Sequence, residues 1–349
     1  KMKITDIKIF KMAAPTWHKA GTNNWLFVKI YTDSGIHGVG EGSLQYKDAA
    51  LEAEILDFGK FLIGKDPFQI EFIWNSLYRR VTWTGGAVTM SAISAIDIAL
   101  WDIKGKYLSA PIWMLIGGKV RDKIRLHLLM GGSRPDASDL GTTAENLRLN
   151  AIDARNEGYT AVKIDPLPDG YQSMTISRLI RETKDNVAAL REGAGLDVDI
   201  ILEIHRKLTP MNAIALAEEL KEFNPLFYED PIQIDSIKSQ GEIANKTSLP
   251  LANGERMHNI WEFREMFEAG GSQYARPDLG LAGGITHVKK IASIAESYHS
   301  ALVTHNFLGP VLTAAACTID STIPNFITQE FSTIDESPVN NMIKTSWKR

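Results

Sequence analysis

Ionisable residues recur at the ends of apolar, strand-like runs in the second half of the chain. They are Lys163 and Asp165, Glu203 and His205, Glu229, Glu255, Asp278, His305 and Glu330. Glu203, Glu229 and Glu255 follow consecutive runs, and three carboxylates held together are unfavourable unless a cation neutralises them. Mg²⁺ suits carboxylate ligands in a site that keeps room for water and substrate oxygens. We therefore predict that these three glutamates bind Mg²⁺.

His305 is the strongest candidate for a general base. It follows the apolar run "ALVT", and Asp278 stands at the end of the preceding run. A carboxylate that accepts a hydrogen bond from one ring nitrogen raises the basicity of the other nitrogen. The pair therefore predicts a histidine–aspartate dyad that removes a proton from a substrate.

Three further residues complete the predicted chemistry. His205 lies two residues after Glu203, and in a strand both side chains point to one face. His205 could then stand opposite His305 and act as the general acid for a leaving hydroxyl. Lys163 would add a positive charge near the metal. Glu330, if burial keeps it protonated, could donate a hydrogen bond to a developing oxyanion, and a solvated strand-end carboxylate is its other interpretation.

The elements that must position these residues are short apolar runs, each followed by an amphipathic helical pattern. Eight such runs cover residues 126–130, 161–165, 200–204, 226–230, 249–253, 273–278, 301–305 and 326–330. This alternation is typical of a parallel sheet, and eight units favour a closed (β/α)₈ barrel over an open sheet. Active sites of such barrels lie at the C-terminal ends of the strands, where the ionisable residues stand.

The first 120 or so residues follow a different pattern. Residues 4–10 and 25–31 are strand-like, residues 32–42 are rich in turn formers, and helical patterns begin at residue 47. This part predicts a small α+β unit that precedes the barrel.

Composition limits the classes of partner. Lys and Arg number 38 against 42 Asp and Glu, a net charge of −4, so no basic surface favours nucleic acid or an anionic membrane. Cys317 is the single cysteine, which rules out an intrachain disulfide. No signal-peptide core and no run of 18 apolar residues is present. We predict a soluble, cytoplasmic protein.

A series of motifs over nearly the whole chain resembles the enolase superfamily, in its mandelate racemase and acid-sugar dehydratase branch. The motifs are "AIDIALWDIKGK", "YTAVKID", "LEIH", "LFYEDP", "NGER", "ARPDLGLAGGIT", "THNFLGP" and "ITQEF", in the family's order. The resemblance implies an α/β protein with an N-terminal α+β capping domain over a modified TIM barrel, (β/α)₇β. The capping domain would span residues 1–120 and be completed by the tail 331–349, and the barrel would span residues 121–330.

The resemblance also implies the same metal ligands and dyad, and a symmetric homo-oligomer. Racemases and cycloisomerases of the family carry Lys-x-Lys on the second barrel strand, whereas this sequence reads Lys163-Ile164-Asp165. His205 matches the histidine of sugar-acid dehydratases similar to galactonate and gluconate dehydratase. The implied reaction is Mg²⁺-dependent dehydration of an aldonic acid, such as D-gluconate, D-galactonate or D-mannonate, to the 2-keto-3-deoxy acid through an enediolate. The alternatives are an acid-sugar epimerase or racemase and a non-catalytic metal-binding barrel with a binding or regulatory role.

Residues that would bind the distal part of the substrate are harder to find from the sequence. Asp165 stands on the predicted barrel rim, and Trp17, His18, Tyr46 and Trp83 lie in N-terminal segments with turn-like neighbours. These four could form a lid over the barrel mouth or could be exposed patches. We predict that Asp165 and the four lid candidates contact the substrate.

Overall fold

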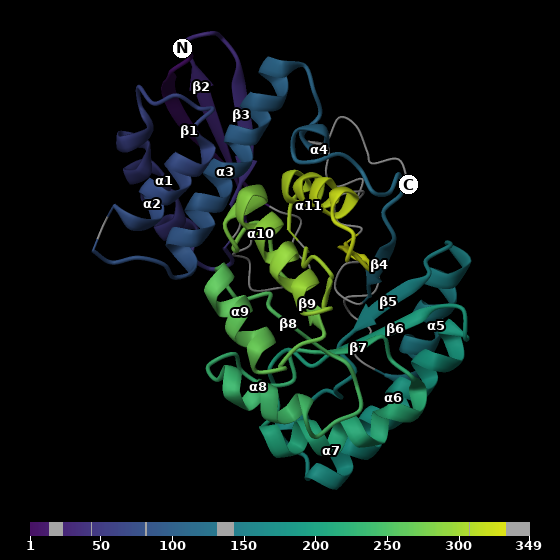
Figure 1. Cartoon of the computed structure of the whole chain (residues 1–349). Coiled ribbons are helices and arrows are strands. Elements are labelled where there is room, and N and C mark those ends of the chain that lie inside the picture. Colours follow the sequence, from purple (N-terminus) through teal and green to yellow (C-terminus); the bar gives the residue numbers. More distant parts are fainter. Residues whose placement is uncertain (14–23, 43, 81, 131–142, 307, 333–349) are drawn as a thin grey trace.

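Two groups of strands organise the chain, and each group has its own helices (Figure 1). The computed structural model describes residues 1–13, 24–42, 44–80, 82–130, 143–306 and 308–332. The N-terminal elements are β1 (Ile4–Ala13), β2 (Asn24–Thr32), β3 (His37–Glu41), α1 (Asp48–Leu62), α2 (Ile70–Arg79), α3 (Ala87–Leu108) and α4 (Ile112–Leu115). The C-terminal elements are β4 (Leu126–Leu129), α5 (Ala144–Asn156), β5 (Ala161–Ile164), α6 (Ile176–Ala194), β6 (Asp199–Glu203), α7 (Pro210–Leu220), β7 (Phe227–Glu229), α8 (Ile237–Ala244), β8 (Leu251–Asn253), α9 (Ile260–Glu268), β9 (Tyr274–Ala275), α10 (Gly284–Ser297), β10 (Ala301–Leu302), α11 (Pro310–Thr322) and β11 (Gln329–Phe331).

An antiparallel sheet in the order β1-β2-β3 forms one layer of the N-terminal part. Alternate residues of β2, Leu26, Val28 and Ile30, are fully buried and join the same apolar core as α1, α2 and α3. This alternation is what a strand with one covered face requires, and burial of that face is the main stabilising contribution.

β3 lies directly against helix α3 because it carries glycine where the two backbones meet. A Cβ atom on Gly38 would lie 2.0 Å from the carbonyl oxygen of Ala99, and one on Gly40 would lie 1.9 Å from that of Ala95. No other residue fits at this distance. The sequence prediction of a turn over residues 32–42 is therefore wrong for residues 37–41, where the glycines serve close packing of a strand.

The eight C-terminal strands are parallel and follow the order β10-β9-β8-β7-β6-β5-β4-β11. Hydrogen bonds from Leu302 N to Asn325 O (2.8 Å) and from Ile327 N to Leu302 O (3.1 Å) join the two ends of this row. Helices α5 to α11 alternate with the strands, and in Figure 1 α5 to α10 form an arc outside them. The described residues thus form the predicted (β/α)₇β barrel.

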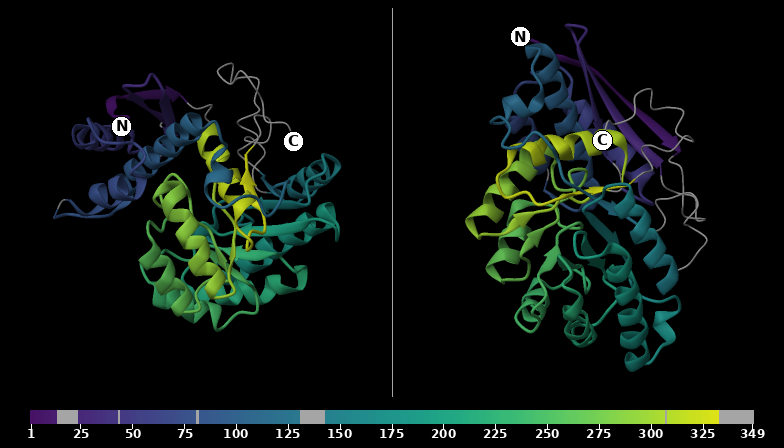
Figure 2. Two further views of the ribbon diagram at one scale, coloured as in Figure 1. Left: turned by 45° about the horizontal axis from the view of Figure 1, so that its top comes forward. Right: turned by 90° about the vertical axis from the view of Figure 1, so that its right-hand side faces the viewer.

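The last two helices of the barrel, α10 and α11, contact the N-terminal part. Helix α10 packs on α3, and α11 packs on β3 and α4. In Figure 2, α11 (yellow) lies between the barrel strands and the N-terminal elements. Helix α3 and strand β3 therefore contact the two helices that follow Asp278 and His305.

In the part of the chain that the structure describes, no helix combines the length and the apolar character needed to cross a membrane.

Candidate active site

Three glutamates meet at the C-terminal ends of neighbouring barrel strands. Glu203 ends β6 and lies opposite Glu229, which ends β7, while Glu255 follows β8 by two residues. One carboxylate oxygen from each lies within 4.8 Å of the others, and Glu203 and Glu229 are fully buried. The predicted clustering of the three carboxylates is confirmed, and the cluster could hold a metal ion.

Two buried cations neutralise part of this charge. Lys163 Nζ lies 3.1 Å from Glu203 Oε2, 3.2 Å from Glu229 Oε2 and 2.8 Å from Glu330 Oε1. Arg276 Nε lies 2.5 Å from Glu229 Oε1, and its Nη2 lies 2.5 Å from Glu330 Oε2. Lys163 therefore lies beside the metal candidates, as predicted.

The ion pairs of Glu330 favour its ionised form over the protonated form that a hydrogen bond to an oxyanion would require. Burial disfavours the ionised carboxylate, but the charges of Lys163 and Arg276 outweigh burial and hold the pKa of Glu330 well below its usual range. Glu330 is therefore ionised and cannot donate a hydrogen bond to an oxyanion. The backbone N–H of Asn306 donates to its Oε2 at 3.2 Å.

The third buried cation, Arg206, binds the remaining glutamate. Its Nη1 lies 2.6 Å from Glu255 Oε1 and also contacts the Asp230 carboxylate. Burial and the neighbouring carboxylates Glu255 and Glu203 raise the pKa of Asp230 to about 7, although Arg206 opposes this shift. Arg206 is thus shared between two carboxylates.

The balance of buried charge fits a divalent cation. Three cations face six carboxylates, so the cluster is short of three positive charges when all six carboxylates are ionised and its histidines are neutral. The carboxylates are those of Glu203, Glu229, Glu255, Glu330, Asp230 and Asp278. Uncompensated buried charge is strongly unfavourable. All-oxygen ligands and this deficit both suit a hard divalent ion.

His305 and Asp278 form the predicted pair. His305 Nδ1 lies 2.6 Å from Asp278 Oδ2, and Nε2 lies 3.3 Å from Glu255 Oε2. The backbone N–H of Gly280 donates to Asp278 Oδ1 at 2.6 Å, which fixes the aspartate. Burial opposes protonation of His305, but the carboxylates of Glu255, Glu330 and Asp278 outweigh burial and raise its pKa.

His205 reaches the site by a different backbone path from the one predicted. Strand β6 ends at Glu203, and His205 has φ +54°, so strand alternation does not apply to it. Its backbone N–H donates to Glu203 Oε1 at 2.9 Å, and its Nδ1 lies 3.0 Å from Asp165 Oδ2. Asp165, predicted to contact substrate, thus contacts His205, and it also contacts Lys207.

The four lid candidates fall into two pairs. Trp17 and His18 fall outside the described residues. Tyr46 and Trp83 are exposed, with 62% and 87% of their surface accessible. Their contact with substrate stays a prediction.

Three site residues were missed from the sequence: Arg206, Asp230 and Arg276. Arg276 could have been predicted as a site residue, because it precedes Asp278 by two residues in the predicted strand and would point to the same face. Arg206 and Asp230 could not have been predicted in this way, since both have positive φ, at +62° and +42°, in turns that follow the strands.

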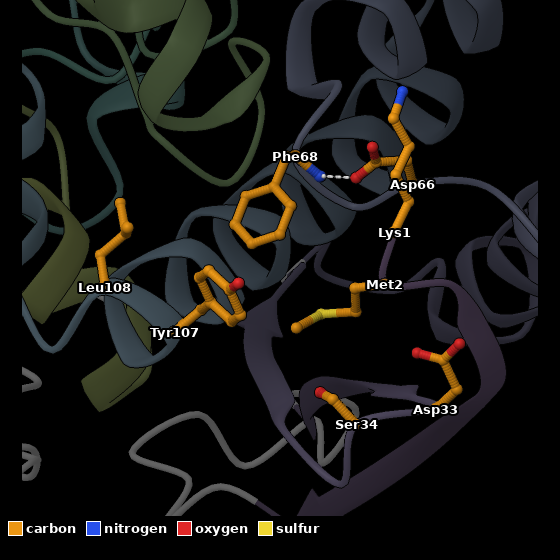
Figure 3. A pocket seen from close by; sticks show the side chains of 8 residues that line it. All are labelled: Lys1, Met2, Asp33, Ser34, Asp66, Phe68, Tyr107 and Leu108. Atoms are coloured by element: carbon orange, nitrogen blue, oxygen red, sulfur yellow. Dashed lines mark hydrogen bonds between the residues drawn. The ribbon is translucent and has the colours of Figure 1, made fainter.

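A hollow in the N-terminal part offers no comparable chemistry (Figure 3). Its volume is about 580 Å³, and it is lined by Lys1, Met2, Asp33, Ser34, Asp66, Phe68, Tyr107 and Leu108. The Asp66 carboxylate already accepts the backbone N–H of Phe68 at 3.0 Å. The carboxylate cluster of the barrel is therefore the candidate active site.

Comparisons with known proteins agree with this architecture. Residues 3–117 match the mandelate racemase / muconate lactonizing enzyme N-terminal domain, and residues 146–347 match the enolase C-terminal domain-like family. D-galactonate dehydratases of Cronobacter sakazakii (strain ATCC BAA-894) and Klebsiella pneumoniae (strain 342) are 37% and 38% identical over 95% of this chain and 82% of theirs. The crystal structure of a mandelate racemase/muconate lactonizing enzyme from Sulfitobacter sp. is 31% identical, with a TM-score of 0.89 over 98% of this chain and 87% of that one. The chain therefore belongs to the mandelate racemase / muconate lactonizing enzyme family of the enolase superfamily.

Proposed function

We propose that this protein dehydrates an aldonic acid with the help of Mg²⁺, and that D-galactonate is the first substrate to test. The observation that carries the proposal is the His305–Asp278 pair beside Glu255 of the carboxylate cluster, which puts a general base next to a metal site. The two D-galactonate dehydratases similar to the chain support both the reaction class, a hydro-lyase, and the substrate.

Glu203, Glu229 and Glu255 would hold the Mg²⁺ ion. A divalent cation at this place would polarise the carboxylate of an acid sugar and so make the proton on C2 more acidic. Lys163 lies among the same carboxylates and adds a fixed positive charge where negative charge develops.

His305 is the proposed base. Asp278 accepts the hydrogen bond from Nδ1 and leaves Nε2 to take the proton from C2. Glu255 contributes to the raised pKa of His305, so a cation bound to Glu255 would weaken that contribution and favour the neutral, basic ring. The electron pair left at C2 then forms the C2–C3 double bond.

His205 is the proposed acid. Burial opposes its protonation, but the carboxylates of Glu203 and Asp165 outweigh burial and raise its pKa. A protonated His205 can give its Nε2 proton to the departing 3-hydroxyl, which leaves as water, and the enol product converts to the 2-keto-3-deoxy acid. Asp165 holds Nδ1 and thereby orients this ring, as Asp278 orients His305.

The experiment is a screen of C5 and C6 aldonic and aldaric acids with Mg²⁺, scored for 2-keto product with a carbonyl reagent. We expect product from one or two epimers, D-galactonate among them. A second run in D₂O separates the alternatives, because deuterium at C2 without loss of water would indicate an epimerase or racemase. Tight Mg²⁺ binding without either reaction would favour a binding or regulatory protein.

The His305→Asn variant tests the base directly. It keeps a polar side chain of similar size but has no ring nitrogen to accept the proton. We expect its dehydration rate to fall by at least about 100-fold, the usual effect of losing a general base. Full activity of this variant would refute the assignment of His305.

Two broader parts of the proposal concern assembly. We propose that residues 1–120 with the C-terminal tail form a capping domain over the barrel, in keeping with the family matches at residues 3–117 and 146–347. We also propose a homo-oligomer, which light scattering of the purified protein would test.

A further inference from the structure

Two barrel helices begin at a glycine and have no capping side chain of their own. The N-cap residues of α10 and α11 are Gly283 and Gly309. Helices α5, α6, α8 and α9 instead begin at residues whose side chains accept a backbone N–H bond of the first turn, namely Thr143, Thr175, Ser236 and Asn259. Helix α7 begins at Thr209, whose side chain makes no such bond, and has proline at its start. The two helices with glycine are those that follow Asp278 and His305.

The first turn of α11 is capped by a residue of the N-terminal part, Glu41. Glu41 Oε1 accepts the N–H of Gly309 at 2.8 Å, and Oε2 accepts those of Val311 and Leu312 at 3.1 Å each. The intervening residue, Pro310, has no N–H to donate. Glu41 is completely buried, and it supplies both the acceptor and the negative charge that a helix N-terminus favours.

Glu41 is itself fixed in place. It is the last residue of β3, whose glycines bring that strand into backbone contact with α3. A Cβ atom on Gly309 would lie 2.4 Å from Glu41 Oε1, so the loop before α11 also depends on glycine for this approach. The position of α11 is thus set by β3 and α3.

The start of α11 is tied to the loop that carries His305. Asn306, the next residue, donates from Nδ2 to Thr313 Oγ1 on α11 at 2.7 Å and from its backbone N to Glu330 Oε2 at 3.2 Å. A displacement of α11 would therefore move Asn306, and with it His305.

The same arrangement recurs at the other half of the dyad. Asp97 of α3 accepts the N–H of Thr286 in the first turn of α10 at 3.0 Å, and Ser94 Oγ accepts the N–H of Gly283 at 2.9 Å. A Cβ atom on Gly284 would lie 2.4 Å from Asp97 Oδ2. Carboxylates of the N-terminal part therefore cap both helices that follow the dyad strands.

We propose that Glu41 is a positioning residue for His305, which it holds in place from outside the barrel through the first turn of α11. The proposal rests on the proposed function, because it takes His305 as the general base. Loss of an ordinary helix cap would lower stability and leave the reaction unchanged, whereas loss of Glu41 should also slow the reaction.

Three variants separate positioning from capping. Glu41→Ala removes the cap, and the double variant Glu41→Ala/Gly309→Ser puts a capping hydroxyl back on α11 itself. Gly309 has φ −87° and ψ 176°, the extended geometry that an N-cap serine adopts, and the three atoms nearest to a Cβ there all belong to the Glu41 carboxylate that the first substitution removes. Thr175→Ala is the control, because it removes the cap of α6, a helix that does not follow the dyad.

We expect Glu41→Ala to lower kcat for D-galactonate by about 10- to 100-fold, with KM changed less than about threefold, because small misplacement of a reacting group has effects of this size. The double variant should regain the wild-type thermal midpoint but not the wild-type kcat. Thr175→Ala should have a lower thermal midpoint and the wild-type kcat. Wild-type kcat in Glu41→Ala, or its recovery in the double variant, would overturn the proposal.

A second readout needs no activity. The chain has eight histidines, so the ring signals can be resolved by ¹H–¹³C NMR, and His305→Gln identifies the signal of His305. We expect this signal to move in Glu41→Ala and to stay in Thr175→Ala. An unmoved signal would overturn the proposal even if no tested acid were dehydrated. If Glu41→Ala does not fold, Glu41→Gln, which keeps one acceptor oxygen, should show the same shift and a smaller loss of kcat, and wild-type values of both would overturn it.

Discussion

Arg276 offers the sharpest test of how the buried charges are balanced. It is completely buried, and its two ion pairs with Glu229 and Glu330 are each 2.5 Å long. Replacement by methionine keeps much of the volume but leaves both carboxylates facing Lys163 alone. Removing one partner from a buried ion pair lowers the free energy of unfolding by about 3–5 kcal/mol.

A surface pair of the same type provides the matched control. Arg178 Nε lies 2.6 Å from Glu182 Oε1, but the arginine side chain is 59% exposed. Exposed pairs of this kind on one helix contribute about 0.3–0.5 kcal/mol. Each kcal/mol shifts the thermal midpoint of a chain of this size by about 2 °C, so we expect a fall of about 6–10 °C for Arg276→Met and about 1 °C or less for Arg178→Met.

The pH dependence gives the second part of this test. Without Arg276, less positive charge counteracts the effect of burial, so the pKa values of Glu229 and Glu330 rise. Over the pH range between the unfolded and folded pKa values, the folded protein then holds protons that the unfolded protein has released. A group whose pKa is raised by folding contributes stability at low pH and loses it as the pH rises. The deficit of Arg276→Met should therefore be smaller at pH 5.5 than at pH 8.

The assay is thermal unfolding by circular dichroism in EDTA at both pH values and one heating rate. EDTA matters because a bound cation would offset the missing arginine. Equal shifts for the two variants, or a deficit for Arg276→Met that grows as the pH falls, would refute the charge balance described for the site.

Three further outcomes are expected. Addition of Mg²⁺ to EDTA-treated protein at about 100 times its dissociation constant should stabilise it by about 2.7 kcal/mol, seen as a higher thermal midpoint, and Glu229→Gln should reduce this shift. His205→Asn should slow dehydration by at least about 100-fold yet still exchange the C2 proton for deuterium in D₂O, because His305 is intact. Loss of both dehydration and exchange would contradict the assignment of His205 as acid and His305 as base. Burial raises the pKa of Asp97 to about 7, so wild-type stability should fall as the pH rises through 7, and Asp97→Asn, followed by thermal unfolding, should lack this part of the decrease.

The barrel could be predicted because its strands and rim carry two independent signals. Short apolar runs mark the strands, and an ionisable residue ends most of them, so the clustering of Glu203, Glu229 and Glu255 and the pairing of His305 with Asp278 followed from strand order alone. Parallel neighbours in a barrel deliver their ends to one rim whatever the details of packing.

Features that depend on local backbone or on distant partners could not be predicted in this way. His205 was placed on a strand, yet the strand ends at Glu203, and two consecutive residues with positive φ redirect the chain. The state of Glu330 depends on Arg276 and Lys163, which lie 54 and 167 positions away in the sequence. β3 was hidden because glycine is rare in strands, and its reason, contact with α3, exists only in three dimensions.

The same limit explains why Glu41 escaped notice in the sequence. Nothing in "GVGEG" indicates a helix cap, because the helix it caps begins 269 residues later at Pro310. The strands β9 and β10 contain only two residues each, and beyond them the pairing resumes as a single bridge between Asp278 and His305. Glycine N-caps leave the helices after them without local anchors. The bridge between Asp278 and His305 and the N–H of Gly280 fix the dyad from within the barrel. Glu41 and Asp97 are buried carboxylates that add to this by binding the following helices from the N-terminal part. A barrel separated from the N-terminal part would keep its metal ligands but leave the N–H groups of Gly309, Val311 and Leu312 without their acceptor.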